Sequence, residues 1–224
     1  PKKISYLLTT EFKQQLLNWA NQFEEVVWLD SNSYEFSSVE YEAILAVEAF
    51  TALKTDHVNA FDKLEEYQQT TKDWIFGYLT YDLKNDVEAL SSTNHDGLGF
   101  PDLYFFQPKK IFLLKKDEVE LHYLGMVDDE MEEDWQAILN TSTIHQTEKE
   151  TTSATINARL TKGEYIARVE KMLAHIHRGD IYEANFCQEF YAEDFSLQPL
   201  STYFDLNTIS KPPFAAYLKL EEFH

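Results

Sequence analysis

Histidines, a cysteine and clustered carboxylates are the side chains of this sequence whose types could do chemistry. His175 and His177 stand two residues apart in a helical pattern, so they lie on different faces and do not form a metal-binding pair. Cys187 lies in a strand-like segment, where a thiol is more often an inert packing residue than a nucleophile. The acidic clusters at 128–130 and 132–134 are typical of a charged helix start rather than of a Mg²⁺ site. These groups by themselves predict no catalytic centre.

The chain is strongly acidic, with 39 acidic and 19 basic side chains among 224 residues and a formal net charge of −20. A field of that sign repels nucleic-acid backbones and anionic membrane surfaces, so we expect neither as a partner. Cys187 is the single cysteine, which excludes an intrachain disulfide. No apolar run reaches 18 residues and the start at Pro1 lacks a secretory pattern, so we expect a cytoplasmic protein.

Hydrophobic periodicity predicts a mixture of helices and strands in the first 140 residues. Apolar stripes predict helices over residues 11–23, around 61–67 and over 129–139. Aromatic and β-branched runs predict strands, and a charged turn at 115–118 predicts that the last two form a hairpin. The predicted strands cover residues 25–29, 43–47, 74–81, 103–106, 110–114 and 119–124.

A polar stretch at residues 140–157 marks the predicted domain boundary. Beyond it, Thr161 and Glu164 fit a capping box that begins a helix, and Gly179 is expected to end it. We predict a strand over 181–191, a helix around 200–206 and a final strand over 214–220.

We therefore predict an α+β fold in which antiparallel β-sheets carry helices on their outer faces, in two subdomains that interleave along the chain. The expected parts are an N-terminal domain (1–140), a linker (141–158) and the beginning of a second domain (159–224). The chain stops at His224 with no turn or cap, which we interpret as a cut within a longer protein.

Two segments of the second half carry a family resemblance. They read Arg178-Gly179-Asp180-Ile181-Tyr182-Glu183-Ala184-Asn185-Phe186-Cys187-Gln188-Glu189-Phe190 and Lys211-Pro212-Pro213-Phe214-Ala215-Ala216-Tyr217-Leu218. In order and spacing they resemble the start of the chorismate-binding domain of the anthranilate synthase component I family, which includes aminodeoxychorismate synthase component I. Weaker matches lie at residues 28–31, 74–83 and 100–103. The resemblance implies the incomplete N-terminal part of an anthranilate-synthase-component-I-like fold.

The Pro213-Phe214 pair is more similar to aminodeoxychorismate synthases, which serve para-aminobenzoate and folate biosynthesis, than to anthranilate synthases. The latter, in tryptophan biosynthesis, remain the alternative, and a non-catalytic small-molecule-binding module is a second one. The sequence departs from the family pattern in two places: Glu183 stands where Gln is usual, and the Phe186-Cys187 pair replaces the usual Leu-Ala or similar pair.

The resemblance implies a transferase reaction in which chorismate and ammonia give 4-amino-4-deoxychorismate. It implies Mg²⁺ as cofactor and a glutamine amidotransferase subunit as the partner that supplies ammonia. The family's metal ligands and catalytic residues lie downstream of the matched segments, so we assign no catalytic and no metal-binding residue here and expect this fragment to be inactive.

The resemblance also implies an amino-acid pocket, which holds tryptophan in some relatives. The matching positions are Ser31, Tyr41, Pro213 and Phe214. From the residues alone, Ser31 is more often a turn former than a ligand contact.

Overall fold

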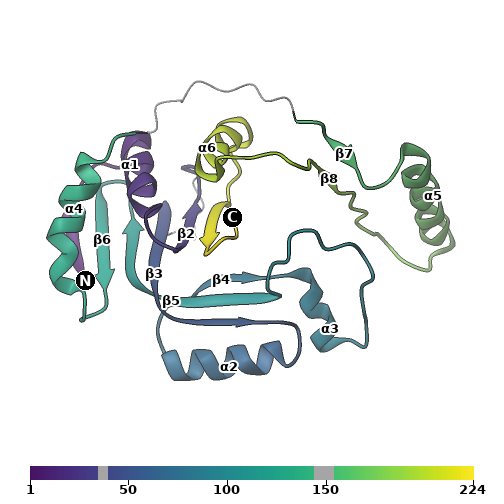
Figure 1. The fold of residues 1–224 in the computed structure, drawn as a ribbon, viewed down its shortest axis with the longest axis horizontal. Helices are drawn as coiled ribbons and strands as arrows, with labels where there is room; N and C mark the ends of the chain where they lie inside the picture. Colours follow the sequence, from purple (N-terminus) through teal and green to yellow (C-terminus); the bar gives the residue numbers. More distant parts are fainter. Residues whose placement is uncertain (35–39, 144–153) are drawn as a thin grey trace. The chain divides into compact units, whose positions relative to one another are not determined.

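The computed structural model describes residues 1–34, 40–143 and 154–224 (Figure 1). The chain forms two compact units: a larger unit, Pro1–Gln146 with Pro199–His224, and a smaller unit, Thr147–Gln198. The sequence predicts residues 199–224 as part of the second domain, but in the structure they belong to the larger unit, because β9 (Ala215–Leu220) pairs with β2 (Glu25–Asp30) near the N-terminus. Most of the predicted linker, residues 144–153, lies outside the described residues.

The larger unit is built on an antiparallel seven-stranded sheet with the order β1-β6-β5-β3-β2-β9, in which β4 also pairs with β5. The strands are β1 (Lys2–Ser5), β2 (Glu25–Asp30), β3 (Ala43–Thr55), β4 (Phe76–Leu79), β5 (Leu103–Leu114), β6 (Glu118–Tyr123) and β9 (Ala215–Leu220). The predicted hairpin is confirmed, since Leu114 of β5 pairs with Val119 of β6. The predicted α+β class with antiparallel pairing is confirmed as well.

Helices accompany this sheet in the larger unit. They are α1 (Thr10–Ala20), α2 (Ala60–Thr71), α3 (Lys84–Val87), α4 (Met131–Asn140) and α6 (Pro199–Ser210), with 3₁₀ turns η1 (Tyr81–Leu83) and η2 (Asp128–Glu130). Thr9 caps α1, because its hydroxyl accepts a hydrogen bond from the Phe12 backbone N–H at 3.1 Å. Phe12 and Leu16 are fully buried, and the burial of each such side chain contributes roughly 1.5–3 kcal/mol to folding. None of the described helices is both long and apolar enough to cross a membrane.

Both faces of the sheet carry apolar clusters, which follow the alternation of side chains along β2. Val26 and Trp28 belong to the cluster that includes α1 and α4 side chains, whereas Val27 belongs to a second cluster. Successive side chains of a strand point to opposite faces, so Leu29 follows Val27 onto the second face.

The smaller unit contains α5 (Lys162–Arg178) and two short paired strands, β7 (Asn157–Ala158) and β8 (Phe190–Tyr191). The predicted capping box of Thr161 and Glu164 is confirmed, and Gly179 ends the helix at φ 81°. The strand predicted over 181–191 is wrong except for its last two residues. A period-two pattern becomes a strand only where a neighbouring backbone completes the hydrogen-bond ladder, and the described structure gives only residues 190–191 such a partner, β7.

A buried carboxylate on β6 makes the acid stability of the larger unit testable. Glu120 is 7% exposed and contacts Lys3 at 2.8 Å, Lys115 at 2.9 Å and His122 at 3.3 Å. These hydrogen bonds hold the pKa of Glu120 well below its ordinary value of 4.5, and the hydrogen bond from Lys3 has the largest effect. A carboxyl group whose pKa is lower in the folded than in the unfolded state stabilises the fold at pH values above its unfolded-state pKa. This stabilisation is lost as the pH falls below that pKa.

We therefore expect Glu120→Gln to be less stable than the native sequence at neutral pH and to lose less stability on acidification below about pH 4.5. Urea unfolding at a series of pH values measures both effects. Glu118→Gln is the matched control, because Glu118 contacts Lys3 at a longer 3.1 Å and is more exposed. An acid dependence of Glu120→Gln that parallels the native one would contradict the assignment.

Candidate functional site

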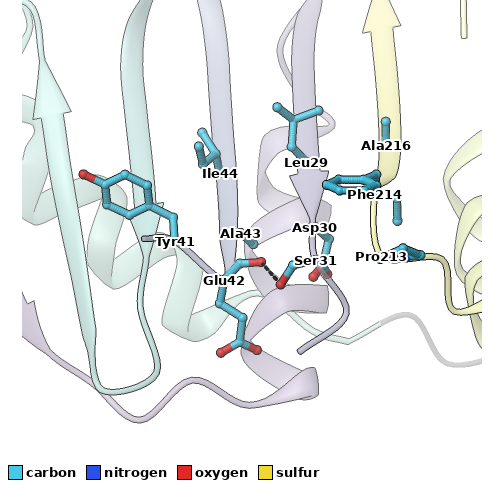
Figure 2. A pocket seen from close by; sticks show the side chains of 11 residues that line it. Leu29, Asp30, Ser31, Tyr41, Glu42, Ala43, Ile44, Pro213, Phe214 and Ala216 are labelled. Atoms are coloured by element: carbon cyan, nitrogen blue, oxygen red, sulfur yellow. Dashed lines mark hydrogen bonds between the residues drawn. The ribbon is translucent and has the colours of Figure 1, made fainter. Parts of the chain in front are cut away.

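A small pocket lies where the ends of β2, β3 and β9 meet. Its volume is about 210 Å³, and Figure 2 shows the side chains that line it. The three strand ends coincide because Asp30 of β2 is paired with Ala43 of β3 on one side and with Ala215 of β9 on the other. The pocket is lined by Leu29, Asp30, Ser31, Tyr41, Glu42, Ala43, Ile44, Pro213, Phe214, Ala215 and Ala216.

The four positions singled out from the sequence, Ser31, Tyr41, Pro213 and Phe214, all line this pocket. They come from two segments far apart in the chain, which the pairing of β9 with β2 brings together. Figure 2 shows Tyr41 at one side of the lining and Phe214 at the other. Their convergence is a property of the fold; that they bind an amino acid stays a prediction.

Most of the lining is apolar, and part of it is accessible. Phe214 is 80% exposed and Leu29 is 40% exposed, values unusual for large apolar side chains beside a concave surface. Leu29, Ile44 and Ala216 also line the pocket and were not predicted from the sequence. The alternation of side chains along β2, β3 and β9 was the available indication, but its use requires knowledge of which face of the sheet remains uncovered.

Ser31 begins the turn that follows β2, since its carbonyl oxygen accepts a hydrogen bond from the Tyr34 backbone N–H at 3.0 Å. The Ser31 hydroxyl donates to the Glu42 carbonyl oxygen at 3.0 Å, drawn as the dashed line in Figure 2, and its backbone N–H donates to the same oxygen at 3.0 Å. The turn-forming role of Ser31 is therefore confirmed. The hydroxyl oxygen keeps its acceptor capacity, so this role and a ligand contact are compatible.

Two carboxylates beside the pocket share one ammonium. Lys13 of α1, only 13% exposed, contacts Asp30 at 2.9 Å and Glu42 at 3.1 Å. Ser33 donates a further hydrogen bond to Glu42 at 2.8 Å. This network reduces the negative potential that two carboxylates would otherwise place at the pocket in a chain of net charge −20.

Tyr41 contributes a hydroxyl that stays protonated at neutral pH. Burial is the main cause that raises the pKa of Tyr41, and a hydrogen bond with Glu40 acts in the same direction. The Lys115 ammonium lies 5.1 Å from the centroid of the Tyr41 ring, within the range of a cation–π contact. Figure 2 shows the Tyr41 hydroxyl directed away from the other lining side chains, so Tyr41 offers its ring to the pocket. The pocket thus combines aromatic surface with a serine hydroxyl, which suits recognition of a small molecule with an apolar part and a few polar groups.

The described residues offer no fit for Mg²⁺. Over residues 1–34, 40–143 and 154–224, no group of three or more His, Cys, Asp or Glu side chains is placed to hold a metal ion. Mg²⁺ prefers several oxygen ligands in octahedral geometry, and the carboxylates at the pocket are engaged by Lys13. No chemical step through a metal is derived for this part of the chain.

Comparisons with a family model and with individual known proteins point to the same family. A family model described as "chorismate binding enzyme" matches residues 15–224. The chain is 27% identical over 161 residues to an "Anthranilate synthase component I-like protein" of Synechocystis sp., covering 71% of this chain and 33% of that protein. It is 25% identical over 158 residues to an "Aminodeoxychorismate synthase component 1" of Bacillus subtilis, covering 66% of this chain and 33% of that protein.

A third relative is also named as an anthranilate synthase. The chain is 25% identical over 154 residues to an "Anthranilate synthase component 1" of Thermus thermophilus, covering 66% of this chain and 33% of that protein. The chain thus spans about one third of the length of the curated relatives it matches. Identities of 25–27% to proteins of both names do not separate the two synthases.

Proposed function

Because this chain belongs to the chorismate binding enzyme family, we propose that it is part of an aminodeoxychorismate synthase component I. Relatives with both synthase names match the chain at 23–27% identity, so they support the family but not the choice within it. The observation that carries the choice is the Pro213-Phe214 pair, which resembles the aminodeoxychorismate synthase segment more than the anthranilate synthase segment. The convergence of Ser31, Tyr41, Pro213 and Phe214 on one pocket supports the amino-acid site that the family resemblance implies for either synthase.

The proposed reaction of the whole protein is the amination of chorismate in the route to para-aminobenzoate and folate. Ammonia forms a bond to C4 of chorismate, the C4–oxygen bond breaks, and the hydroxyl group leaves as water. We propose a glutamine amidotransferase subunit as the source of ammonia, Mg²⁺ as the cofactor and the cytoplasm as the location. The described residues contribute no assigned catalytic group, so this activity is proposed for the whole protein rather than for this part of it.

We propose that the pocket binds an amino acid with an apolar side chain, of which tryptophan is the candidate. Leu29, Ile44 and Phe214 offer apolar surface to such a side chain. The Ser31 oxygen can accept a hydrogen bond from the ligand's ammonium group, since its own proton is donated to Glu42.

Turnover of the whole protein tests the proposed reaction. The natively expressed gene product, supplied with chorismate, ammonium and Mg²⁺, should consume chorismate and yield 4-amino-4-deoxychorismate, identified by mass spectrometry. Anthranilate as the product would instead assign the chain to the alternative synthase. A native product near 26.3 kDa without turnover would favour a non-catalytic binding module.

The amino-acid pocket is tested separately on this chain. We expect L-tryptophan to raise the thermal unfolding temperature, because a ligand that binds only the folded state stabilises it. Phe214→Ala should weaken binding roughly tenfold, equivalent to about 1.4 kcal/mol, by removing an apolar wall. Its stability without ligand should change by no more than about 0.5 kcal/mol, because Phe214 is 80% exposed.

Ile209→Ala is the matched control, since Ile209 is an equally exposed apolar residue, at 83%, that does not line the pocket. Isothermal titration calorimetry gives the dissociation constants. Equal affinities of native and Phe214→Ala chains would remove Phe214 from the site, and an absence of binding to the native chain would refute tryptophan as the ligand.

A further inference from the structure

The two walls of the pocket are joined behind it by a pair of asparagines. Asn32 directly follows Ser31 on one wall, and Pro212 directly precedes Pro213 on the other. The Asn32 Nδ2 group donates to the Pro212 carbonyl oxygen at 2.7 Å and to Asn207 Oδ1 at 2.8 Å. Asn207 Nδ2 donates in return to Asn32 Oδ1 at 2.9 Å. Three hydrogen bonds therefore connect the two walls and α6.

The conformation at residue 32 explains why asparagine suits this connection. Asn32 has φ 51°, in the left-handed region that asparagine tolerates better than most residues with a side chain. Its amide uses both N–H bonds and its oxygen in the three hydrogen bonds described, so one orientation of the amide meets all three partners. Asn207 contributes the complementary donor and acceptor from α6 (Pro199–Ser210).

Two further contacts brace the same junction. The Asp30 carboxylate accepts from the Asn32 backbone N–H at 2.8 Å while it pairs with Lys13 at 2.9 Å. One helical turn before Asn207, the Tyr203 hydroxyl accepts a hydrogen bond from the Trp28 indole N–H at 3.0 Å. Because β2 and α6 are linked at both places, the asparagine pair lies in a rigid setting rather than at a loose loop contact.

We propose that Asn32 and Asn207 are positioning residues that fix the separation of the two pocket walls, so that an amino-acid ligand meets a preformed site. This inference rests on the proposed pocket function. Neither asparagine lines the pocket, so both act through Ser31 and Pro213 rather than by touching the ligand. Preorganisation of this kind raises affinity because the cost of ordering the site is met during folding and not on binding.

Two substitutions and their combination test the proposal on the purified chain with L-tryptophan as probe. Asn207→Ala removes the reciprocal pair, and Asn32→Gly removes all three hydrogen bonds while permitting the positive φ. We expect the dissociation constant to rise on the order of fivefold for Asn207→Ala and at least as much for Asn32→Gly. Adding Asn207→Ala to Asn32→Gly should change it less than twofold further, because the shared contact is already lost.

Thr208→Ala is the matched control and should leave affinity unchanged, since the Thr208 hydroxyl donates to the Phe204 carbonyl oxygen of its own helix rather than to a pocket wall. Hydrogen exchange without ligand supplies a second readout: Asn207→Ala should accelerate exchange in residues 211–218, and Thr208→Ala should not. Circular dichroism confirms that each variant is folded at the temperature of measurement.

The outcomes separate this inference from the proposed function. Two results would contradict the positioning role if the native chain binds L-tryptophan. One is that Asn207→Ala has the native dissociation constant and native hydrogen exchange; the other is that the effects of the two substitutions on the dissociation constant are additive. If the native chain does not bind L-tryptophan, the proposed ligand is wrong and exchange alone decides: faster exchange in Asn207→Ala supports the positioning role, and unchanged exchange overturns it.

Discussion

Lys110→Ala is expected to lower the free energy of unfolding of the larger unit by about 3 kcal/mol, because it removes a buried cation and leaves Asp134, which is only 14% exposed, without its ion-pair partner. The Lys110 side chain is only 3% exposed and contacts Glu130 at 2.6 Å and Asp134 at 2.7 Å. Burial opposes the charge of Lys110, but the hydrogen bonds that its ammonium donates to Asp134 and Glu130 outweigh this effect and raise the Lys110 pKa. The ammonium also lies 5.4–5.9 Å from three ring centroids, those of Trp19, Phe23 and Tyr123.

The neighbouring lysine supplies the control for this prediction. Lys109 pairs with Glu48 at 2.6 Å, but its side chain is 25% exposed, so Lys109→Ala should cost no more than about 1 kcal/mol. Lys110→Met retains most of the packing of the lysine methylene groups. The difference in unfolding free energy between Lys110→Met and Lys110→Ala therefore measures the contribution of that packing. Urea unfolding measures all three, and similar losses for Lys109→Ala and Lys110→Ala would contradict the buried-charge explanation.

Gly77→Val is expected to destabilise the larger unit by about 3 kcal/mol, because β4 cannot pair with β5 if residue 77 carries a side chain. A β-carbon at Gly77 would lie 1.9 Å from the Tyr104 carbonyl oxygen and 2.7 Å from the Phe105 Cα atom. Both are backbone atoms of the strand that pairs with β4, so relief requires separation of the two strands. Phe76, 7% exposed in the second cluster, would lose its packing with Phe106.

Gly125→Ala is the control in the same unit, because a β-carbon there meets nothing within 4 Å. Its unfolding free energy should stay within about 0.5 kcal/mol of the native value. Hydrogen exchange of β4 and urea unfolding distinguish local separation from global destabilisation. Native stability and native β4 protection in Gly77→Val would show that the strands accommodate the side chain.

Local elements were largely predictable because their determinants are local. The apolar stripe that includes Phe12 and Leu16 defines α1, and the Thr161–Glu164 pair with Gly179 defines both ends of α5. The charged turn between β5 and β6 predicted their hairpin. The segment 181–191 was misassigned because strand formation depends on a partner that alternation along one segment does not reveal.

The candidate site was partly predictable, and only through family resemblance. Ser31, Tyr41, Pro213 and Phe214 were found in this way, and the structure places them around one pocket. The asparagine pair was not found, because Asn32 in a turn and Asn207 in a helix each have an ordinary local explanation.

Charge, most helices and strands and the family motifs follow from the order of neighbouring residues and can be predicted without a structure. The membership of residues 199–224 in the larger unit, and the pocket that Ser31 and Phe214 share, become evident only in the folded chain. Both depend on the pairing of β9 with β2, and neither strand's sequence specifies its partner, because any two strands can be joined by the same backbone hydrogen bonds.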